Sequence, residues 1–588
     1  MNQILQAIEP TESKRKQGLA ISCNDAAGWD YHAERLVVCR AWEKWLHRVM
    51  AAQGWLGNTD DGGFDESGRG WCDGRQAAYN LGGLLAARTW AGKLSCDATR
   101  LDTTVVRAAD FLSRRQRPDG QLDLSGIYSP NEAGFPVPAI VAGYSALRQA
   151  GDGLFDRIGP TIEQFLRRAG EAVLAGSAHT ANHRWAAAAA PLAALHSLWP
   201  DPRYLQKIEA YLADGIDCDE DGCWYIERSP CYNMVANRAM LLMADYLQRP
   251  EFIEPVVRNL RYVLRHLQPN AEIDTSLSHR QDRAKPNCHP VVYGVARRVA
   301  SLTADGQVAH LAWTALHRGD GVVDVQLPAM YELDRDPKAM PVPEIPSTTY
   351  EHHFPHTQST RLRNDRRALT LAADHGGHFY DVVRDQWVGP RRSEDWFHLH
   401  WGDIVVQSLH LAGPLRCIQP ADIQRGADGS YRLSGHMPGW EHCLHFRPGS
   451  PTVQMPWNWH HDIRVQWLGD ELTLHLHCDA TEILLSALHL WVRPGVWLKD
   501  ANSRRLLSAG QIIELDGGND VSLSSDHSTL RITGLPAAQH RVALSPQPAI
   551  PCAMEKTCAC LSLGLRLPVD LTLTFCSDNA MGVGSKHV

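Results

Sequence analysis

The sequence has no long apolar run. No stretch approaches the roughly 18 uninterrupted apolar residues that cross a bilayer, and the N-terminal segment MNQILQAIEPTESKRKQGLA has no apolar core of the secretory type. The 15 cysteines form no Cys-x-x-Cys pair. Scattered cysteines in a chain without an export signal are most simply reduced thiols. We therefore expect a cytoplasmic protein that does not span a membrane.

An excess of positive charge is also missing. The 58 Lys and Arg residues face 66 Asp and Glu residues, which gives a formal net charge of -8. This balance argues against binding of nucleic acid or of an acidic membrane, but a few local arginines could still bind a short anion. The 19 tryptophans and 29 histidines suit sugar stacking and proton transfer, although a large core alone accounts for most of the tryptophans.

The first half of the 588-residue chain has a helical pattern with a repeat. Apolar residues recur at three- and four-residue spacing, and an Asp-Gly pair recurs after a helix and before an aromatic residue. Helical hairpins that repeat in this way bury their apolar faces only by stacking or by closing into a ring. We predict an α/α toroid (an incomplete helical barrel) over residues 1–325, with helices at 33–53, 76–92, 103–116 and 203–215.

The pattern changes after the helical half. Residues 326–350 are proline-rich and aperiodic, which is typical of a linker. Residues 351–588 contain short alternating runs such as IRVQWLGDELTLHLHC, broken by Gly, Asp and Pro. Such runs predict an antiparallel β-sandwich. The expected fold class is α+β multidomain, with the toroid followed by the sandwich.

The segment TANHRW at 180–185 is the first candidate for catalytic chemistry. Asparagine is a favoured N-cap residue, so Asn182 and His183 are expected at the open start of a helix. An imidazole there could act as a general base near neutral pH. The alternative is a capping asparagine followed by a solvated histidine.

A second candidate is the loop GIDCDEDGCWYIERSPCYN at 215–233. Its alternating aspartates match the start of a calcium loop, but the position of the bidentate ligand falls on Arg228, whose charge repels calcium. We interpret the acidic run as a solvated turn. The loop ends at Tyr232, and a nearby arginine, Arg228 or Arg238, would stabilise its phenolate. A tyrosine packed beneath its own loop is the alternative.

A third stretch, SLSHRQDRAKPNCHP at 276–290, contains His279, Arg280 and Arg283. Arginines at a pocket rim suit a bidentate clamp on a carboxylate, and the alternative is a pair of surface arginines.

Together these motifs resemble the heparinase II/III-like polysaccharide lyases and the related alginate and chondroitin lyases. ANHRW is similar to the segment in which such lyases carry an Asn beside the His, and DGCWYIERSPCYN to the loop that ends in their catalytic tyrosine. The resemblance implies Asn182, His183 and Tyr232 as catalytic residues. It further implies substrate-binding roles for Arg184, Tyr225, Glu227, Arg228, His279, Arg280, Arg283 and His400.

The sequence departs from this pattern in the β-domain. Many members have a compact His-x-His-x-Asp cluster there, and the nearest matches are DHGGHFYD at 374–381 and HLHWGD at 398–403. Neither fits cleanly, and zinc needs three or four tetrahedral ligands. We assign no metal site and expect no required cofactor; a structural Zn or Ca has no support in the sequence.

The resemblance implies β-elimination at C4 of a uronate, which leaves a 4,5-unsaturated uronate. In the cytoplasm the substrate would be an imported acidic oligosaccharide, and the state of oligomerisation, including a homo-oligomer, is open. One alternative is a toroidal glycoside hydrolase acting on unsaturated uronyl oligosaccharides. A sugar epimerase and a catalytically inactive carbohydrate-binding protein are the others. A hydrolase would draw on the carboxylates Asp73, Asp119, Asp221 and Glu227.

Overall fold

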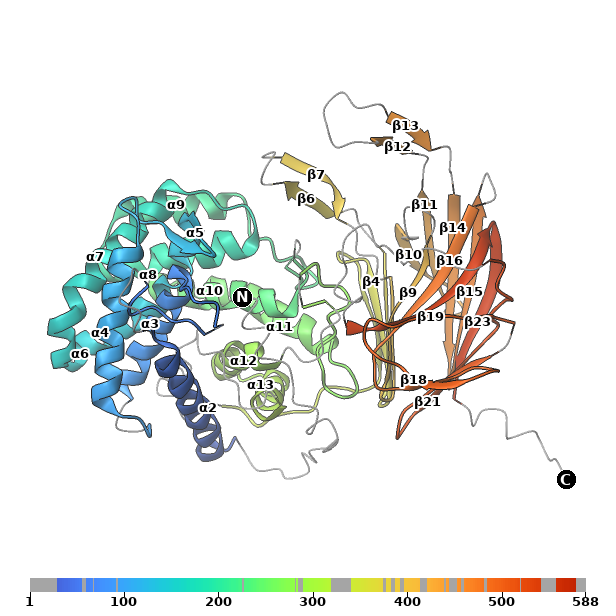
Figure 1. Ribbon diagram of the computed structural model, residues 1–588, viewed down its shortest axis with the longest axis horizontal. Coiled ribbons are helices and arrows are strands. Elements are labelled where there is room, and N and C mark those ends of the chain that lie inside the picture. The colour runs from blue at the N-terminus through green and yellow to red at the C-terminus, as the bar shows by residue number, and fades with distance from the viewer. Residues whose placement is uncertain are drawn as a thin grey trace. The chain divides into compact units, whose positions relative to one another are not determined.

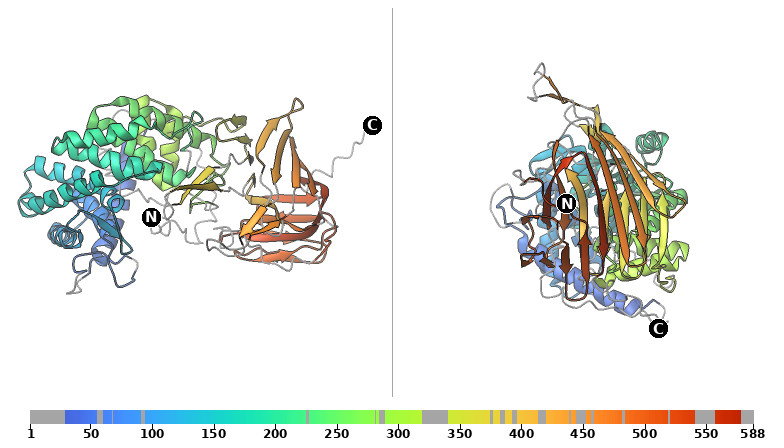
Figure 2. Two further views of the ribbon diagram at one scale, coloured as in Figure 1. Left: turned by 90° about the horizontal axis from the view of Figure 1, so that it is seen from above. Right: turned by 90° about the vertical axis from the view of Figure 1, so that its right-hand side faces the viewer.

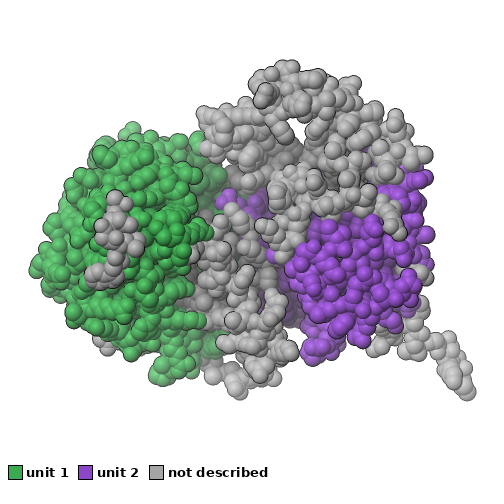
Figure 3. All heavy atoms as spheres, viewed as in Figure 1, with its two compact units in different colours: residues 1–264, 287–346 green, residues 265–286, 347–588 purple. Residues whose placement is uncertain are grey.

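The computed structural model divides the chain into two compact units (Figure 3). Unit 1 comprises residues 1–264 and 287–346, and unit 2 comprises residues 265–286 and 347–588. The described residues are 29–54, 60–66, 68–90, 94–224, 227–280, 282–283, 289–318, 340–373, 377–381, 386–391, 396–412, 420–437, 440–443, 452–455, 459–480, 484–518, 520–540 and 557–577. Much of the predicted linker lies outside them. Unlike the single predicted boundary, this division groups residues 265–286 with the β-strands.

Unit 1 is helical (Figure 1). Its elements are α2 Tyr31–Ala52, α3 Gly74–Thr89, α4 Ala98–Arg115, β1 Leu122–Leu124, β2 Ile127–Ser129, α5 Pro130–Gly134, α6 Val137–Ala150, α7 Gly153–Ala175, η3 Asn182–Ala189, α8 Ala190–Leu198, α9 Pro202–Ala213, α10 Pro230–Leu247, η4 Pro250–Phe252, α11 Ile253–Arg265, α12 His289–Thr303 and α13 Gly306–Arg318. The four predicted helices are found as α2, α3, α4 and α9. Several begin at a capping aspartate, such as Asp97 before α4, whose carboxylate accepts the amide of Arg100.

The helices form two layers. In one layer α3 packs against α6, α6 against α8, and α8 against α10, which also packs against α12. In the other layer α4 packs against α3 and α7, and α9 against α8. Because members of the two layers alternate along the chain, consecutive members of the first layer begin at the same end of the unit. No described helix is long and apolar enough to cross a membrane.

The Asp-Gly repeat marks one structural position that recurs. Gly62, Gly120 and Gly222 have φ angles of +87°, +83° and +90°, respectively. A Cβ at these glycines would lie 2.4, 1.9 and 2.4 Å from the carbonyl oxygens of Arg107, Arg168 and Arg258 in α4, α7 and α11. Glycine is therefore required both by the left-handed turn and by the close approach to the next helix. At the glycine of each repeat, the loop packs against the next helix, which is α4, α7 or α11.

A buried amide reinforces this joint. Gln53, after α2, donates to the carbonyl oxygens of Gly62 at 3.1 Å and Thr104 at 2.9 Å. Gln116, after α4, donates in the same way to Gly120 and Phe165, both at 3.1 Å. Each glutamine thus links the carbonyl of a loop glycine to a carbonyl of the next helix, α4 or α7.

Unit 2 is built of strands, which the right-hand view of Figure 2 shows side by side. They are β3 Tyr350–Phe354, β4 Ser359–Arg363, β5 Arg367–Ala372, β6 Gly377–Asp381, β7 Gln386–Arg391, β8 Phe397–Trp401, β9 Ile404–Ala412, β10 Asp422–Arg425, β11 Tyr431–Met437, β12 Trp440–Cys443, β13 Thr452–Met455, β14 Trp459–Leu468, β15 Glu471–Ala480, β16 Leu484–Val492, β17 Trp497–Lys499, β18 Arg504–Leu506, β19 Ile512–Glu514, β20 Val521–Ser524, β21 Thr529–Thr533, β22 Ala559–Leu567 and β23 Val569–Cys576.

Two large sheets enclose one apolar core. The first has the strand order β10-β11-β14-β15-β23-β21-β20-β17-β18, and the second β19-β22-β16-β9-β8-β5-β4-β3. Leu433 and Leu474 of the first sheet share a core cluster with Leu399 and Leu561 of the second. Inward and outward residues alternate along β14, as a strand with one solvated face requires. Among the described strands β19 and β22 pair in parallel; the other pairings are antiparallel.

Residues 265–280 pack on the outer face of the second sheet. Arg361 of β4 is completely buried and donates to the Asp274 carboxylate at 2.9 Å. Asp274 also accepts the hydroxyl of Thr370 at 2.6 Å, and Gln268 accepts a second Arg361 donor at 2.7 Å. This segment covers the face of the sheet away from the core, so β5 and β8 are buried on both faces, and the charge of Arg361 beneath it is paired with Asp274.

Candidate active site

Asn182 is not an N-cap residue, contrary to the prediction from its sequence. Residues Asn182–Ala189 form a π-helix, Ala181 occupies the cap position, and Asn182 makes no capping hydrogen bond. The amide of Arg184 instead donates to the carbonyl of Thr180 at 2.7 Å. The side chain of Asn182 is consequently buried, with 3% exposed. Short π-helical segments are rare and occur often at functional sites.

The Asn182 side chain joins two of the predicted motifs. Its Nδ2 donates a hydrogen bond to Oε2 of Glu227, which lies in the loop before α10 and is also 3% exposed. The Oδ1 atom of Asn182 is buried and has no hydrogen-bond partner among the described residues. A buried amide oxygen without a partner is unusual in a folded protein. The TANHRW and CWYIERSPCYN segments therefore meet at this contact.

A buried polar network anchors that loop to the neighbouring helices. The indole of Trp224 donates to Asn237 of α10 at 2.9 Å, and Asn237 donates to Asn259 of α11 at 2.7 Å. Asn259 in turn donates to the carbonyl of Gly222 at 2.7 Å. Because all of these hydrogen bonds are buried, the network holds the loop in one conformation against α10 and α11.

The backbone of the loop is strained where it turns toward Asn182. Arg228 has φ +45°, a left-handed conformation that costs a residue with a side chain about 1 kcal/mol or more. Its amide donates to the carbonyl of Trp224 at 3.0 Å. Immediately after it, the Ser229 hydroxyl caps α10 by accepting the amide of Tyr232 at 3.0 Å. Tyr232 is thus fixed in the first turn of α10, and it is buried.

His183 faces a third wall of the site. Its ring centroid lies 5.7 Å from that of Phe135, which follows α5, and the guanidinium carbon of Arg75 lies 5.8 Å from the centroid of Phe135. Arg75, in the first turn of α3, forms an ion pair of 2.6 Å with Glu132. Burial raises the pKa of Glu132, and the adjacent Arg75 opposes that rise. The starts of α3, α5, η3 and α10 therefore lie at one end of unit 1.

This convergence has an electrostatic consequence. Each helix N-terminus carries the positive end of the helix dipole, although one first-turn amide of α3, α5 and α10 is already bound by Asp123, Ser129 and Ser229, respectively. Several such ends directed at one region favour a bound anion, even though the whole chain carries a net charge of -8.

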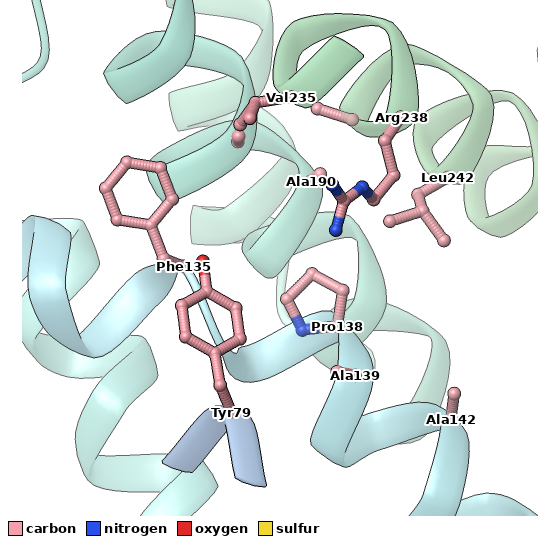
Figure 4. A pocket seen from close by; sticks show the side chains of 11 residues that line it. Tyr79, Phe135, Pro138, Ala139, Ala142, Ala190, Val235, Arg238 and Leu242 are labelled. Atoms are coloured by element: carbon pink, nitrogen blue, oxygen red, sulfur yellow. The ribbon is translucent and has the colours of Figure 1, made fainter. Parts of the chain in front are cut away.

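A pocket lies one to two helical turns further along the same helices (Figure 4). On α10, Val235 and Arg238 follow Tyr232 on one face, and on the η3–α8 segment Ala186 and Ala190 follow Asn182. The guanidinium of Arg238 and the hydroxyl of Tyr79 point into the pocket, whose other walls are apolar (Figure 4). The lining residues are Tyr79, Phe135, Pro138, Ala139, Ala142, Ala186, Ala190, Val235, Arg238, Ala239 and Leu242.

The remaining residues of unit 1 that the sequence predicted for the site have different surroundings. Arg184 donates to the Gly215 carbonyl at 3.4 Å and lies 5.7 Å from the ring centroid of Trp185. Arg228 is buried within its loop. Tyr225 lies outside the described residues. Asp119, named above as a carboxylate for a hydrolase, accepts the amide of Gln121 within its own exposed turn.

The predicted residues of unit 2 lie in two places. His279, Arg280 and Arg283 occupy the half-buried turn at 276–283, where the Ser278 hydroxyl donates to Asp282. His400 lies on β8 and is 1% exposed, and neither of its ring nitrogens has a hydrogen-bond partner among the described residues. Burial lowers the pKa of His400 to about 3, which keeps its imidazole neutral. The predicted roles of these four residues stay predictions.

Within the described residues, no three His, Cys, Asp or Glu side chains gather as a metal site would require. The Asp219 carboxylate accepts the amide of Cys223 at 2.8 Å and so closes the turn that resembles a calcium loop. His375 lies outside the described residues, and so do the side chains of His378 and Asp381.

The sequence reasoning missed Arg75, Glu132, Phe135 and Tyr79. Arg75 directly follows one of the repeated Asp-Gly loops, and Glu132 is in the first turn after a capping Ser129. The Asp-Gly repeat includes the loop before Tyr232, and a search of the residues that follow the other repeated loops would have found both Arg75 and Glu132.

The fold and the polar cluster define a class of protein: a helical toroid followed by a β-sandwich, with amide, imidazole and phenol side chains at the ends of adjacent helices. Searches against family models and curated proteins find no match to the sequence. Among solved structures, heparinase III matches with a TM-score of 0.55 and 11% identity over 98% of this chain and 88% of that one. The Streptomyces coelicolor A3 chondroitin AC lyase, in complex with chondroitin sulphate, matches with a TM-score of 0.52 and 11% identity over 94% and 80%. The chain therefore has a heparinase- and chondroitinase-like polysaccharide lyase fold.

Proposed function

We propose that the protein is a lyase that cleaves a uronic-acid-containing glycan by β-elimination. The observation that carries the proposal is the hydrogen bond between Asn182 and Glu227, which brings the ANHRW segment to the loop that ends in Tyr232. The fold shared with two polysaccharide lyases supports it. The converging helix N-termini, which favour an anionic ligand, support it independently.

The reaction needs three functions at one sugar ring. Asn182 donates an N–H to the uronate carboxylate and stabilises the charge that develops as C5 loses its proton. His183 takes that proton, and the C5–H electron pair becomes the C4–C5 double bond. The C4–O4 bond breaks, and Tyr232 protonates the departing O4. The products are a 4,5-unsaturated uronate and a shorter sugar with a free hydroxyl.

The environment of His183 suits a base. Its ring is half-buried, its Nδ1 lies 3.2 Å from the Thr180 hydroxyl, and Phe135 covers one side. The hydroxyl contact orients the imidazole, so Nε2 is the nitrogen that the substrate would meet. The mostly apolar pocket beyond it limits competition from water.

Incubation with a panel of uronate oligosaccharides tests the proposal, because the conjugated product of elimination absorbs ultraviolet light. His183→Ala and Tyr232→Phe should each lower kcat by about 10² to 10⁴. Two matched substitutions at residues to which we assign no catalytic role serve as controls: His317→Ala, on the exposed end of α13, and Tyr211→Phe, on α9. Near-normal turnover by either site variant would refute its assigned role.

One observation favours a glycoside hydrolase as a second candidate. Burial raises the pKa values of both Asp73 and Glu132, and each lies close enough to Arg75 for its charge to oppose the rise. A carboxyl with a raised pKa is what a general acid requires. Sugar release without a gain in ultraviolet absorbance would favour hydrolysis over elimination.

We further propose that the substrate is a short acidic oligosaccharide imported into the cytoplasm, as the sequence predicts. Product analysis separates this from attack on a long polymer. An oligosaccharide-specific enzyme should release terminal units, whereas ladders of intermediate lengths from a long chain would contradict it.

A further inference from the structure

The hydrogen bond between Asn182 and Glu227 does more than bring the two residues together, because it also sets the orientation of the Asn182 amide. An ionised carboxylate only accepts hydrogen bonds, so the amide must turn its nitrogen toward Glu227. This fixes which edge of the Asn182 amide faces away. The second N–H of Nδ2 and the unpartnered Oδ1 are then left for a ligand. Without Glu227 the amide could rotate by half a turn and present its oxygen to an acidic substrate.

The loop that carries Glu227 is built to hold it in place. On its N-terminal side Trp224 is tied to Asn237 by the indole N–H, at 2.9 Å. On its C-terminal side come the left-handed Arg228 and the Ser229 cap of α10. Glu227 is therefore fixed between two anchored points, and the same backbone leads directly to Tyr232.

Two features of Glu227 argue against direct contact with the substrate. Asn182 covers the carboxylate oxygen that it binds. A second negative charge touching a uronate would also repel it. The substrate-binding role predicted for Glu227 from the sequence therefore fits the geometry less well than a role behind Asn182.

We propose that Glu227 is a positioning residue: its carboxylate holds the Asn182 amide so that the remaining N–H meets the carboxylate of the bound uronate. This inference rests on the proposed lyase function. It assigns Glu227 no contact with the substrate, and the effect of Glu227 on the substrate passes through Asn182.

Three substitutions separate positioning from the alternatives. Glu227→Gln keeps an acceptor oxygen without the charge, and its kcat should stay within about tenfold of the original. Glu227→Leu has no acceptor, and its kcat should fall by about 10² to 10³, as expected when a donor to developing charge is lost. Glu227→Asp keeps the charge but shortens the side chain, so it should resemble the Leu variant. Glu220→Gln, an exposed change in the same loop, is the control.

The measured quantities are kcat and KM for formation of the unsaturated product, with melting temperatures to verify folding. Positioning predicts a loss in kcat with KM within about threefold, and no further loss when Asn182→Ala is added to Glu227→Leu, because residues that act as a unit are not additive. A raised KM with an unchanged kcat would show substrate binding and overturn the inference. So would a Leu variant as active as the original. If Leu prevents folding, equal activity of the Gln and Asp variants overturns it.

A failure of the proposed lyase function would give a different experimental result from a failure of the positioning role. In that case the unsubstituted protein forms no unsaturated product from any member of the panel, and both proposals fall together. If the unsubstituted protein is active and the Glu227 substitutions leave kcat unchanged, only the positioning role is refuted.

Discussion

Acidification should destabilise unit 2 through two buried histidines. His489 of β16 is 4% exposed, and burial, reinforced by the neighbouring His410 of β9, lowers its pKa from 6.5 to about 4. The pKa of His400 is lowered to about 3. Both imidazoles are therefore neutral in the folded protein across the pH range in which unfolded histidine becomes charged.

The sign and size of the effect follow from proton linkage. Below pH 6.5 the unfolded state binds a proton at each histidine that the folded state does not, so stability falls as pH falls. Between about pH 7.5 and pH 5, a shift of this size costs about 2 kcal/mol for His489 and about 2 kcal/mol for His400. The loss would level off only near the folded pKa values, below about pH 4.

A comparison of variants isolates this contribution. In His489→Gln the site no longer titrates, so the stability lost between about pH 7.5 and pH 5 should shrink by about 2 kcal/mol. With a urea m-value of about 3 kcal/mol/M, that is a difference of about 0.7 M in the shift of the unfolding midpoint. Tryptophan fluorescence can follow the transition. If the original and the variant lose stability in parallel, His489 does not titrate as argued.

The other predictions concern packing and charge. Gly222→Ala should destabilise unit 1 by about 2 kcal/mol or more, because it combines left-handed strain with a contact of 2.4 Å to a carbonyl oxygen. Gly215→Ala, at φ +85° with nothing within 4 Å, should cost only the backbone strain. Equal unfolding free energies for the two variants would refute a cost from the contact at Gly222. Arg361→Met should cost about 3 to 5 kcal/mol because it leaves the buried charge of Asp274 without its partner. Arg432→Met, in an exposed ion pair, should cost about 1 kcal/mol or less by the same denaturation assay.

The sequence pattern was sufficient to predict the helical and β-stranded parts of the chain, because its apolar spacing repeats along each part. Apolar spacing located α2, α3, α4 and α9, and period-two runs located strands such as β14 and β15. The Asp-Gly loops marked a recurring joint because glycine alone fits a left-handed turn against a carbonyl, as at Gly120. The glutamines that complete the joint, Gln53 and Gln116, carry no such signal, since a lone glutamine after a helix usually reaches solvent.

The candidate site was only partly predictable. Local sequence indicated Asn182 as a helix cap, because cap preference is a local property. Its actual orientation depends on a π-helical turn and on Glu227, forty-five positions away in sequence. Likewise, the grouping of residues 265–286 with the strands depends on the ion pair between Asp274 and Arg361. Contacts of this range follow from how the elements pack, which single-sequence periodicity does not encode.

The tryptophans near the site illustrate how composition misleads about function. Trp185 and Trp224 are fully buried, and their indole N–H groups donate to Asp217 at 2.7 Å and Asn237 at 2.9 Å. Each therefore uses its ring for packing and its polar edge to fix a loop, which leaves no face for a sugar. The rings that do border the pocket are Tyr79 and Phe135 (Figure 4). These two indoles thus hold loops of the site in place, and the two aromatic residues that border the pocket were not part of the motifs.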